Sequence, residues 1–196
     1  IKYIRNHLED NAFNHLENKV LERLVHTSGD FKIQNLLEFS KDACQIGINS
    51  LKNGAPILTD TDMAAAAIKT MAENTTGNKI FSASNWSEEA TDSRLTKTAY
   101  GLSEGWLELS SKNLGTKSPI IVIGSSPTAL INLLDILEDS KKFPSLIIGM
   151  PVGFIGVEKS KQKLIGSNLS RIVINSTRGG AAMAAATVNA LLRECI

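Results

Sequence analysis

The sequence is poor in cysteine, in aromatic residues and in long hydrophobic runs. Its 196 residues include two cysteines, Cys44 and Cys195, and only 5% Phe, Trp and Tyr. Two cysteines do not make a disulfide framework, so we expect a reducing, cytoplasmic setting. The longest apolar run, Leu146–Val157, has 12 residues, of which three are glycine and one is proline. A membrane-spanning helix needs about 20 apolar residues, so we expect neither such a helix nor a signal peptide.

An excess of charge of one sign is also lacking. The chain has 21 Lys and Arg against 20 Asp and Glu, a net charge of +1. This balance gives no electrostatic reason to bind nucleic acid or an anionic membrane, and we expect neither partner. With 42% hydrophobic residues the chain can bury a core of ordinary size. It starts at Ile1 rather than at Met, so we expect missing N-terminal sequence ahead of a single domain over residues 1–196.

Three short β-forming runs are each followed by a loop and a helical pattern. The runs are Ile120–Ile123, Leu146–Ile148 and Arg171–Ile174. Three such units in succession are typical of an α/β fold, in which helices flank a parallel, Rossmann-like sheet. Ligands of open sheets bind at the carboxyl ends of the strands. Shorter strands are expected at 57–58 and 79–83, and helices at 1–12, 14–29, 40–54, 63–73, 92–112, 127–137 and 182–192.

The loops after these strands carry groups that suit an anion. Ser126 and Thr128 place hydroxyls beside one helix N-terminus, Arg178 precedes another, and Gly153 leaves bare backbone in the third loop. Helix N-termini attract carboxylates and phosphates through free N–H groups and partial positive charge. Glycines that merely permit tight turns are the alternative explanation for each loop. Three loops on one edge favour a large anionic ligand.

His26 is the best candidate for acid–base chemistry. It falls in the last turn of the helix predicted from Asn14, with Arg23 three residues earlier on roughly the same face. The helix C-terminus favours the protonated imidazole by roughly 0.3–1 kcal/mol, and Arg23 opposes it. A histidine that only caps the helix is the alternative. His15 is expected to face solvent, and His7 has no evident partner.

Other candidate sites are weaker. Asp60 and Asp62 lack a neighbouring His or Cys cluster, so helix capping is favoured over a metal site and no metal is expected. The segment GMPVGFIG is not GxGxxG and no GxxxxGK[ST] occurs, which disfavours dinucleotides and ATP. Lys159, Lys161 and Lys163 are interpreted as a solvated face.

Five segments together resemble the precorrin-8X methylmutase family, over nearly the whole chain. Singly each is modestly specific, but their order and spacing are highly specific. The segments are RLVHTSGD at 23–30, GAPILTDTDM at 54–63, GSSPTAL at 124–130, GMPVGFIGVEKSK at 149–161 and GGAAMAAATVNAL at 179–191.

The resemblance implies an isomerase that moves a methyl group from C11 to C12 of a corrin precursor, with or without cobalt. It implies that His26 is the proton donor and acceptor and that Arg23 binds substrate. It also implies a homodimer and no redox cofactor. The substrate is a flat tetrapyrrole edged with carboxylates, which agrees with the anionic ligand expected from the loops.

Several positions depart from the family pattern. The family's Thr-Arg-Ser/Thr-Ala motif has Lys97 in place of arginine, beside Thr98, and lysine loses bidentate carboxylate binding. Ser125 replaces an asparagine and Lys159 a glutamate. Thr177 stands where the family has an arginine, Arg178 follows one residue later, and Ala181 replaces a serine. These changes support a second hypothesis, a diverged paralogue that binds corrinoids without catalysis. A nucleotide-binding α/β domain is a third.

Overall fold

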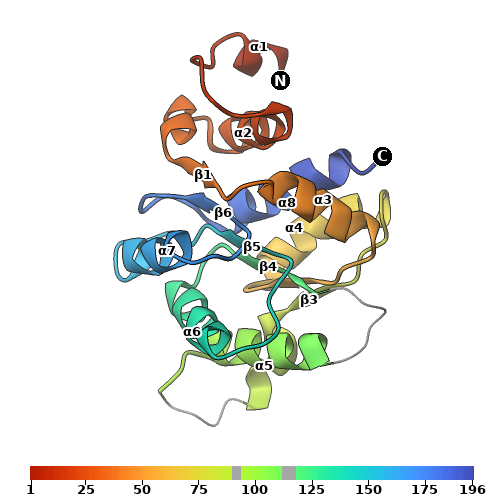
Figure 1. Ribbon diagram of the computed structural model, residues 1–196, viewed down its shortest axis with the longest axis vertical. Coiled ribbons are helices and arrows are strands. Elements are labelled where there is room, and N and C mark those ends of the chain that lie inside the picture. Colours follow the sequence, from red (N-terminus) through yellow and green to blue (C-terminus); the bar gives the residue numbers. More distant parts are fainter. Residues whose placement is uncertain (90–93, 112–117) are drawn as a thin grey trace.

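The computed structural model describes residues 1–89, 94–111 and 118–196, and a six-stranded sheet lies at its centre (Figure 1). The strand order is β1-β6-β5-β4-β2-β3. Strands β2 to β6 run parallel, and β1 pairs antiparallel with β6. The strands are β1 Leu37–Phe39, β2 Ile57–Thr59, β3 Ile80–Ser82, β4 Ile120–Ile123, β5 Leu146–Gly149 and β6 Arg171–Ile174.

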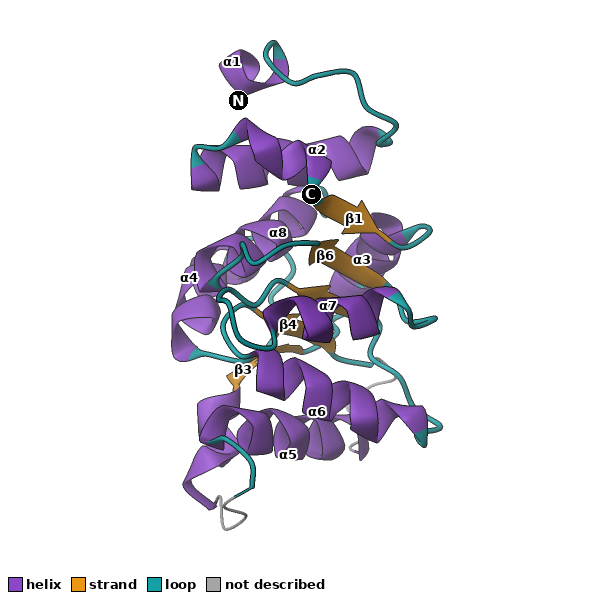
Figure 2. Ribbon diagram, turned by 90° about the vertical axis from the view of Figure 1, so that its left-hand side faces the viewer, coloured by secondary structure: helices purple, strands orange, loops and turns teal. Residues whose placement is uncertain are grey.

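Helices cover both faces of this sheet. They are α1 Lys2–Arg5, α2 His15–Ser28, α3 Ala43–Lys52, α4 Asp62–Glu73, α5 Lys97–Ser111, α6 Pro127–Glu138, α7 Val157–Ile165 and α8 Ala181–Arg193, with 3-10 segments η1 Phe31–Asn35 and η2 Ala83–Glu89. One face is covered by α3, α4 and α8, and the other by α5, α6 and α7 (Figure 2). α2 packs on α8 beyond the β1 edge.

The central strands are buried on both sides, which explains their continuous apolar sequence. In β4, Ile120 and Val122 belong to the core beneath α3, α4 and α8, whereas Ile121 and Ile123 belong to the core beneath α5 and α6. This alternation is the two-residue period of a strand. The predicted α/β sheet is confirmed, and its three central strands are the three predicted units in adjacent, parallel order.

Local signals placed α2 correctly. The Asn14 side chain accepts hydrogen bonds from the N–H groups of Leu16 and Glu17, and the Glu17 side chain accepts one from the Asn14 N–H. Gly29 ends the helix in the left-handed conformation at φ 66°. This capping box and glycine stop are the ones that the sequence predicted.

Three predictions of local structure were wrong. No strand was expected before α3, yet β1 is present, and the helix expected from Ser40 begins at Ala43. Ser40 instead extends the strand pairing, because its N–H donates to the Arg171 carbonyl at 3.0 Å. The helix expected over 1–12 is only α1. Residues 92, 93 and 112 of the helix predicted over 92–112 lie outside the described residues, and α5 begins at Lys97 because residues 94–96 are not helical.

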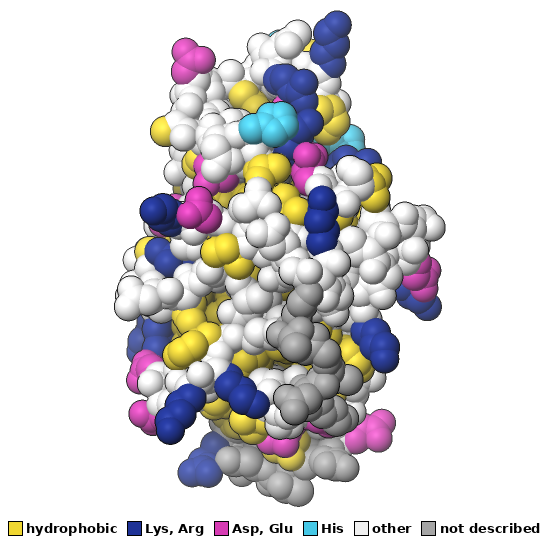
Figure 3. Space-filling view, turned by 45° about the vertical axis from the view of Figure 1, so that its right-hand side comes forward, with side chains coloured by type: hydrophobic (Ala, Val, Ile, Leu, Met, Phe, Trp, Pro, Cys, Tyr) yellow, Lys and Arg dark blue, Asp and Glu magenta, His cyan; other side chains and the backbone are white. Residues whose placement is uncertain are grey.

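The face in Figure 3 carries basic and acidic side chains interspersed, with apolar side chains between them. Neither sign of charge gathers into one patch there. Among the described residues, no helix has the length and apolar character that crossing a membrane requires.

Two glycines let α5 approach η2 closely. A Cβ atom at Gly101 would lie 2.1 Å from the Ala83 carbonyl oxygen, and one at Gly105 would lie 2.8 Å from the Trp86 ring. The Trp86 indole N–H donates to the Glu108 carboxylate at 2.7 Å. These contacts hold the middle and the C-terminal part of α5 against η2.

We expect Gly101→Ala to lower the free energy of unfolding by about 1–3 kcal/mol, because the added methyl group overlaps a backbone atom. Urea denaturation would measure the change. Gly166→Ala is the matched control, since its Cβ would lie 3.4 Å from the nearest atom outside its neighbours. Equal stability of the two variants would contradict the close packing of α5 on η2.

Candidate active site

A buried carboxylate ties together two loops at the carboxyl edge of the sheet. Asp60 follows β2 directly and is 3% exposed. Its Oδ2 accepts hydrogen bonds from the backbone N–H groups of Ser125 and Ser126, at 2.6 and 2.9 Å. Asp60 does not cap α4, because Thr61 does so through the Ala64 N–H. The role of Asp60 is therefore to fix the turn between β4 and α6.

The pKa values of the two aspartates after β2 are shifted in opposite directions. Burial raises the pKa of Asp60 above 3.8, and the backbone hydrogen bonds offset part of that increase. The Asp60 Oδ1 is buried and has no hydrogen-bond partner among the described residues. Asp62 is exposed, and hydrogen bonds from Ser82 and Ser84 lower its pKa.

Four of the predicted site residues form one group at this edge. Lys97 and Thr98, in the first turn of α5, line a recess of about 230 Å³ at the ends of β2 and β3. The neighbouring Thr96 hydroxyl lies 3.2 Å from that of Thr128, which lies 3.0 Å from the Ser126 hydroxyl. The Ser126 hydroxyl also caps α6. A basic side chain is thus brought beside a row of hydroxyl groups.

The loops after β5 and β6 pack backbone against backbone. The Gly153 N–H donates to the Thr177 carbonyl at 3.1 Å, and the Gly180 N–H donates to the Met150 carbonyl at 2.9 Å. A Cβ atom at Gly179 would lie 2.1 Å from the same Met150 oxygen. These contacts hold Gly153 and the segment with Arg178 together, next to the β4–α6 turn.

Lys161 lies beneath the β6–α8 loop, and its interpretation as a solvated residue was wrong. Its side chain has no exposed surface, and Nζ donates to the carbonyls of Ser176 and Arg178, both at 2.6 Å. Burial lowers the Lys161 pKa to about 8, and Glu158 opposes this change. Lys159 is exposed, as predicted.

The C-terminal end of α2 reaches the same edge through an ion pair. The Asp30 carboxylate pairs with the Arg178 guanidinium. His26 is exposed in the last turn of α2, four residues before Asp30. The ion pair therefore holds the turn that carries the imidazole against the β6–α8 loop.

Arg23 lies apart from the other predicted residues. It lines a recess of about 270 Å³ with Ile1, Arg5, Arg193 and residues near them, between α2 and the C-terminal end of α8. Burial, and to a smaller extent Arg193, lowers the Arg23 pKa. The structure does not bring Arg23 to the group formed by Lys97, Thr98 and the hydroxyls.

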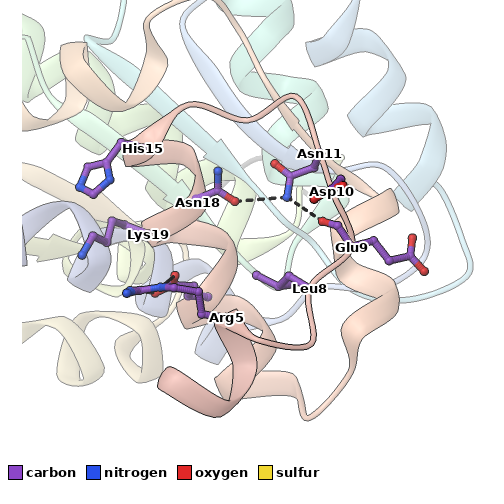
Figure 4. A pocket seen from close by; sticks show the side chains of 9 residues that line it. Arg5, Leu8, Glu9, Asp10, Asn11, His15, Asn18 and Lys19 are labelled. Carbon is purple, nitrogen blue, oxygen red and sulfur yellow. Dashed lines mark hydrogen bonds and ion pairs between the residues drawn. The ribbon is translucent and has the colours of Figure 1, made fainter.

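Another recess, of about 440 Å³, separates the N-terminal segment from α2 (Figure 4). His15 and Lys19 lie along its α2 side, and Asn11 bridges to Asn18 and to the Glu9 carbonyl. None of the predicted site residues lines this recess.

The arrangement offers hydrogen bonding and positive charge along an extended edge. Adjacent strands lie about 4.8 Å apart, so the edge from β6 to β2 spans roughly 14 Å. That length suits a large ligand with several anionic groups. Within residues 1–89, 94–111 and 118–196, no three His, Cys, Asp or Glu side chains are grouped to hold a metal ion.

Sequence reasoning missed three residues of this edge, namely Asp30, Asp60 and Lys161. A signal existed for Lys161, because it follows Val157 by four residues and precedes Leu164 by three, on the buried stripe of α7. Asp60 and Asp30 act on groups 65 and 148 residues away in the sequence, and no local pattern indicates such partners.

Comparisons with known proteins agree on one family. A family model described as precorrin-8X methylmutase matches residues 1–194. A precorrin-8X methylmutase of Pseudomonas aeruginosa is 35% identical over 181 residues, covering 90% of this chain and 83% of that protein. A cobalt-precorrin-8 methylmutase of Synechocystis is 32% identical, covering 90% and 84%. A precorrin-8X methylmutase structure from Thermus thermophilus matches with a TM-score of 0.88 and 26% identity, covering 99% and 92%.

We expect ionisation of Asp60 to weaken folding. A carboxyl whose pKa is raised in the folded state binds more protons there, so its contribution to stability falls as pH rises above about 3.8. The free energy of unfolding of the wild type should therefore fall relative to Asp60→Asn from about pH 4 toward neutrality. Urea denaturation across this range measures the difference.

Asp62→Asn is the control, because the lowered Asp62 pKa gives the opposite sign, in a window below pH 3.8. There the wild type should lose stability relative to Asp62→Asn as pH falls. If the free energies of unfolding of the wild type and Asp60→Asn differ by the same amount at every pH, the burial of an ionisable Asp60 is contradicted.

Proposed function

The chain belongs to the precorrin-8X methylmutase family of isomerases in cobalamin biosynthesis, and we propose that it moves a methyl group from C11 to C12 of precorrin-8X or its cobalt form. The family acts on a tetrapyrrole. The product of this step is hydrogenobyrinate or, with cobalt, cobyrinate. The observation that carries the proposal is the family match over residues 1–194, with His26 present in its motif.

We propose His26 as the proton donor and acceptor. Substrate and product are isomers, so a proton that is taken up during the shift must be returned, and one imidazole can do both. The position of His26 supports this role, because its side chain is exposed and its helix end is held at the carboxyl edge.

The carboxylates of the substrate are proposed to lie along the same edge. Lys97, Thr98, Ser126 and Thr128 offer one ammonium and three hydroxyls near β2 to β4. Gly153 and Arg178 belong to the loops after β5 and β6. Arg23, which lies apart from them, is proposed to contact a peripheral carboxylate. No redox cofactor is proposed, since the substrate and the product of an isomerisation have the same overall oxidation level.

We expect His26→Ala to lower the rate of precorrin-8X conversion by about 10²–10⁴-fold, the range for loss of a general acid–base group. The change in visible absorbance during the reaction measures it. His15→Ala removes an exposed histidine from the other end of the same helix and should retain full activity. Full activity in His26→Ala would overturn the assignment.

The alternative is a diverged, non-catalytic protein that binds corrinoids. The substitutions at Lys97, Ser125, Lys159, Thr177 and Ala181 favour it. An absorbance titration with hydrogenobyrinic acid, combined with the activity assay, separates the two proposals. Tight binding without conversion of precorrin-8X would establish the alternative.

We also propose a homodimer in which the β5–α7 loop lies at the interface. Phe154 and Ile155 are 92% and 91% exposed. Two adjacent large apolar side chains that are this exposed are unusual unless a partner covers them. Sedimentation equilibrium of the wild type should give about twice the mass of one chain. Phe154→Asp with Ile155→Asp should give a monomer, and a monomeric wild type would exclude the dimer.

Two further expectations remain proposals. Residues 1–196 are proposed to act as one domain. The protein is proposed to work in the cytoplasm, which agrees with Cys44 and Cys195 being free thiols.

A further inference from the structure

Lys161 determines the orientation of the β6–α8 loop. Its Nζ approaches the loop from the protein interior and donates to the carbonyl oxygens of Ser176 and Arg178, both at 2.6 Å. No side-chain carboxylate lies within ion-pair distance of Lys161 in the described part of the chain. The buried ammonium therefore interacts with backbone dipoles rather than with a counter-ion.

These two hydrogen bonds also orient the following N–H groups. A trans peptide unit is planar, and its C=O and N–H point in opposite directions. Because the carbonyls of Ser176 and Arg178 point inward to Lys161, the N–H groups of Thr177 and Gly179 point outward, away from the interior.

The outward N–H groups are also the ones without partners. The Arg178 N–H donates to the Ser176 hydroxyl at 3.0 Å, and the Gly180 N–H donates to the Met150 carbonyl at 2.9 Å. In the described residues nothing accepts a hydrogen bond from the N–H of Thr177 or Gly179. Two unpaired donors on alternate residues, above a buried cation, suit a carboxylate.

We propose that the backbone N–H groups of Thr177 and Gly179 form a subsite for one carboxylate of the substrate, and that Lys161 is the positioning residue that builds it. This inference rests on the proposed function for the identity of the ligand. The adjacent Arg178 guanidinium is paired with Asp30, so the N–H groups supply the unshared donors of this loop.

The contribution of Lys161 to stability has to be separated from its effect on the loop. Replacing Lys161 by an apolar side chain would remove a buried charge, but it would also leave the Ser176 and Arg178 carbonyls without their donor. The lowered Lys161 pKa of about 8 reflects the cost of that burial. A merely structural lysine predicts that Lys161→Met changes stability alone, whereas a positioning lysine predicts that ligand binding weakens as well.

We expect Lys161→Met to weaken binding of hydrogenobyrinic acid about tenfold in an absorbance titration, as for the loss of one charge-assisted contact. KM for precorrin-8X should rise by a similar factor while kcat changes by less than about threefold. Urea denaturation should show that the variant is still folded under the assay conditions, although it loses the two hydrogen bonds to the Ser176 and Arg178 carbonyls. Lys163→Met is the matched control, because it removes a charge from the same helix that pairs at the surface with Asp135 and Glu138. Binding within twofold of the wild type in a folded Lys161→Met would overturn the proposal.

A second measurement needs no variant to fold. In the wild type, the ¹⁵N-resolved amide proton signals of Thr177 and Gly179 should move downfield with hydrogenobyrinic acid, and to a smaller extent with sodium acetate relative to sodium chloride. Unmoved signals with both ligands would overturn the subsite. If acetate moves them but the wild type neither binds nor converts corrinoids, the proposed function fails and the carboxylate subsite stands.

Discussion

The hydrogen bonds from two backbone N–H groups to the Asp60 carboxylate are the interaction on which the candidate site depends. They join the end of β2 to the turn after β4, two strands that pair side by side. A buried carboxylate without hydrogen-bond donors is unfavourable. Movement of the turn that carries Ser125 and Ser126 would leave Asp60 in that state, so the turn is held in place. The hydroxyl of Ser126, which caps α6, and that of Thr128 are held in place by the same constraint.

A buried charge of the opposite sign organises the other half of the edge. Lys161 accepts no hydrogen bonds and can only donate, so it pulls carbonyls inward, whereas Asp60 can only accept and pulls N–H groups toward itself. Both residues convert buried charge into a defined loop conformation. Gly179 and Gly124 also define the loop conformation, since a side chain at either position would overlap neighbouring backbone.

An edge whose loops are held by two buried charged residues suits the proposed chemistry. A methyl shift within one molecule needs no electron carrier, so the demands on the protein are to hold a large anionic ring and to provide one group for proton transfer. Rigid loops along roughly 14 Å of sheet edge can meet the first demand. The second is the role proposed for His26, on a helix end held by an ion pair from the β6–α8 loop. Lys97 supplies charge at this edge, with less directional binding than a guanidinium would give.

The sequence by itself determined the elements whose causes are local. Continuous apolar runs fixed the three central strands, and Asn14, Glu17 and Gly29 fixed the ends of α2, because strand burial and helix capping depend on residues close in the chain. Ordered motifs also determined the family. Only the tertiary structure decided which residues meet at the edge. Asp60, Lys161 and Asp30 act on groups distant in the sequence, and Arg23 is separated from Lys97 because their helices pack at different ends of the sheet. Burial and hydrogen-bond geometry arise from contacts between elements, which no single segment of sequence contains.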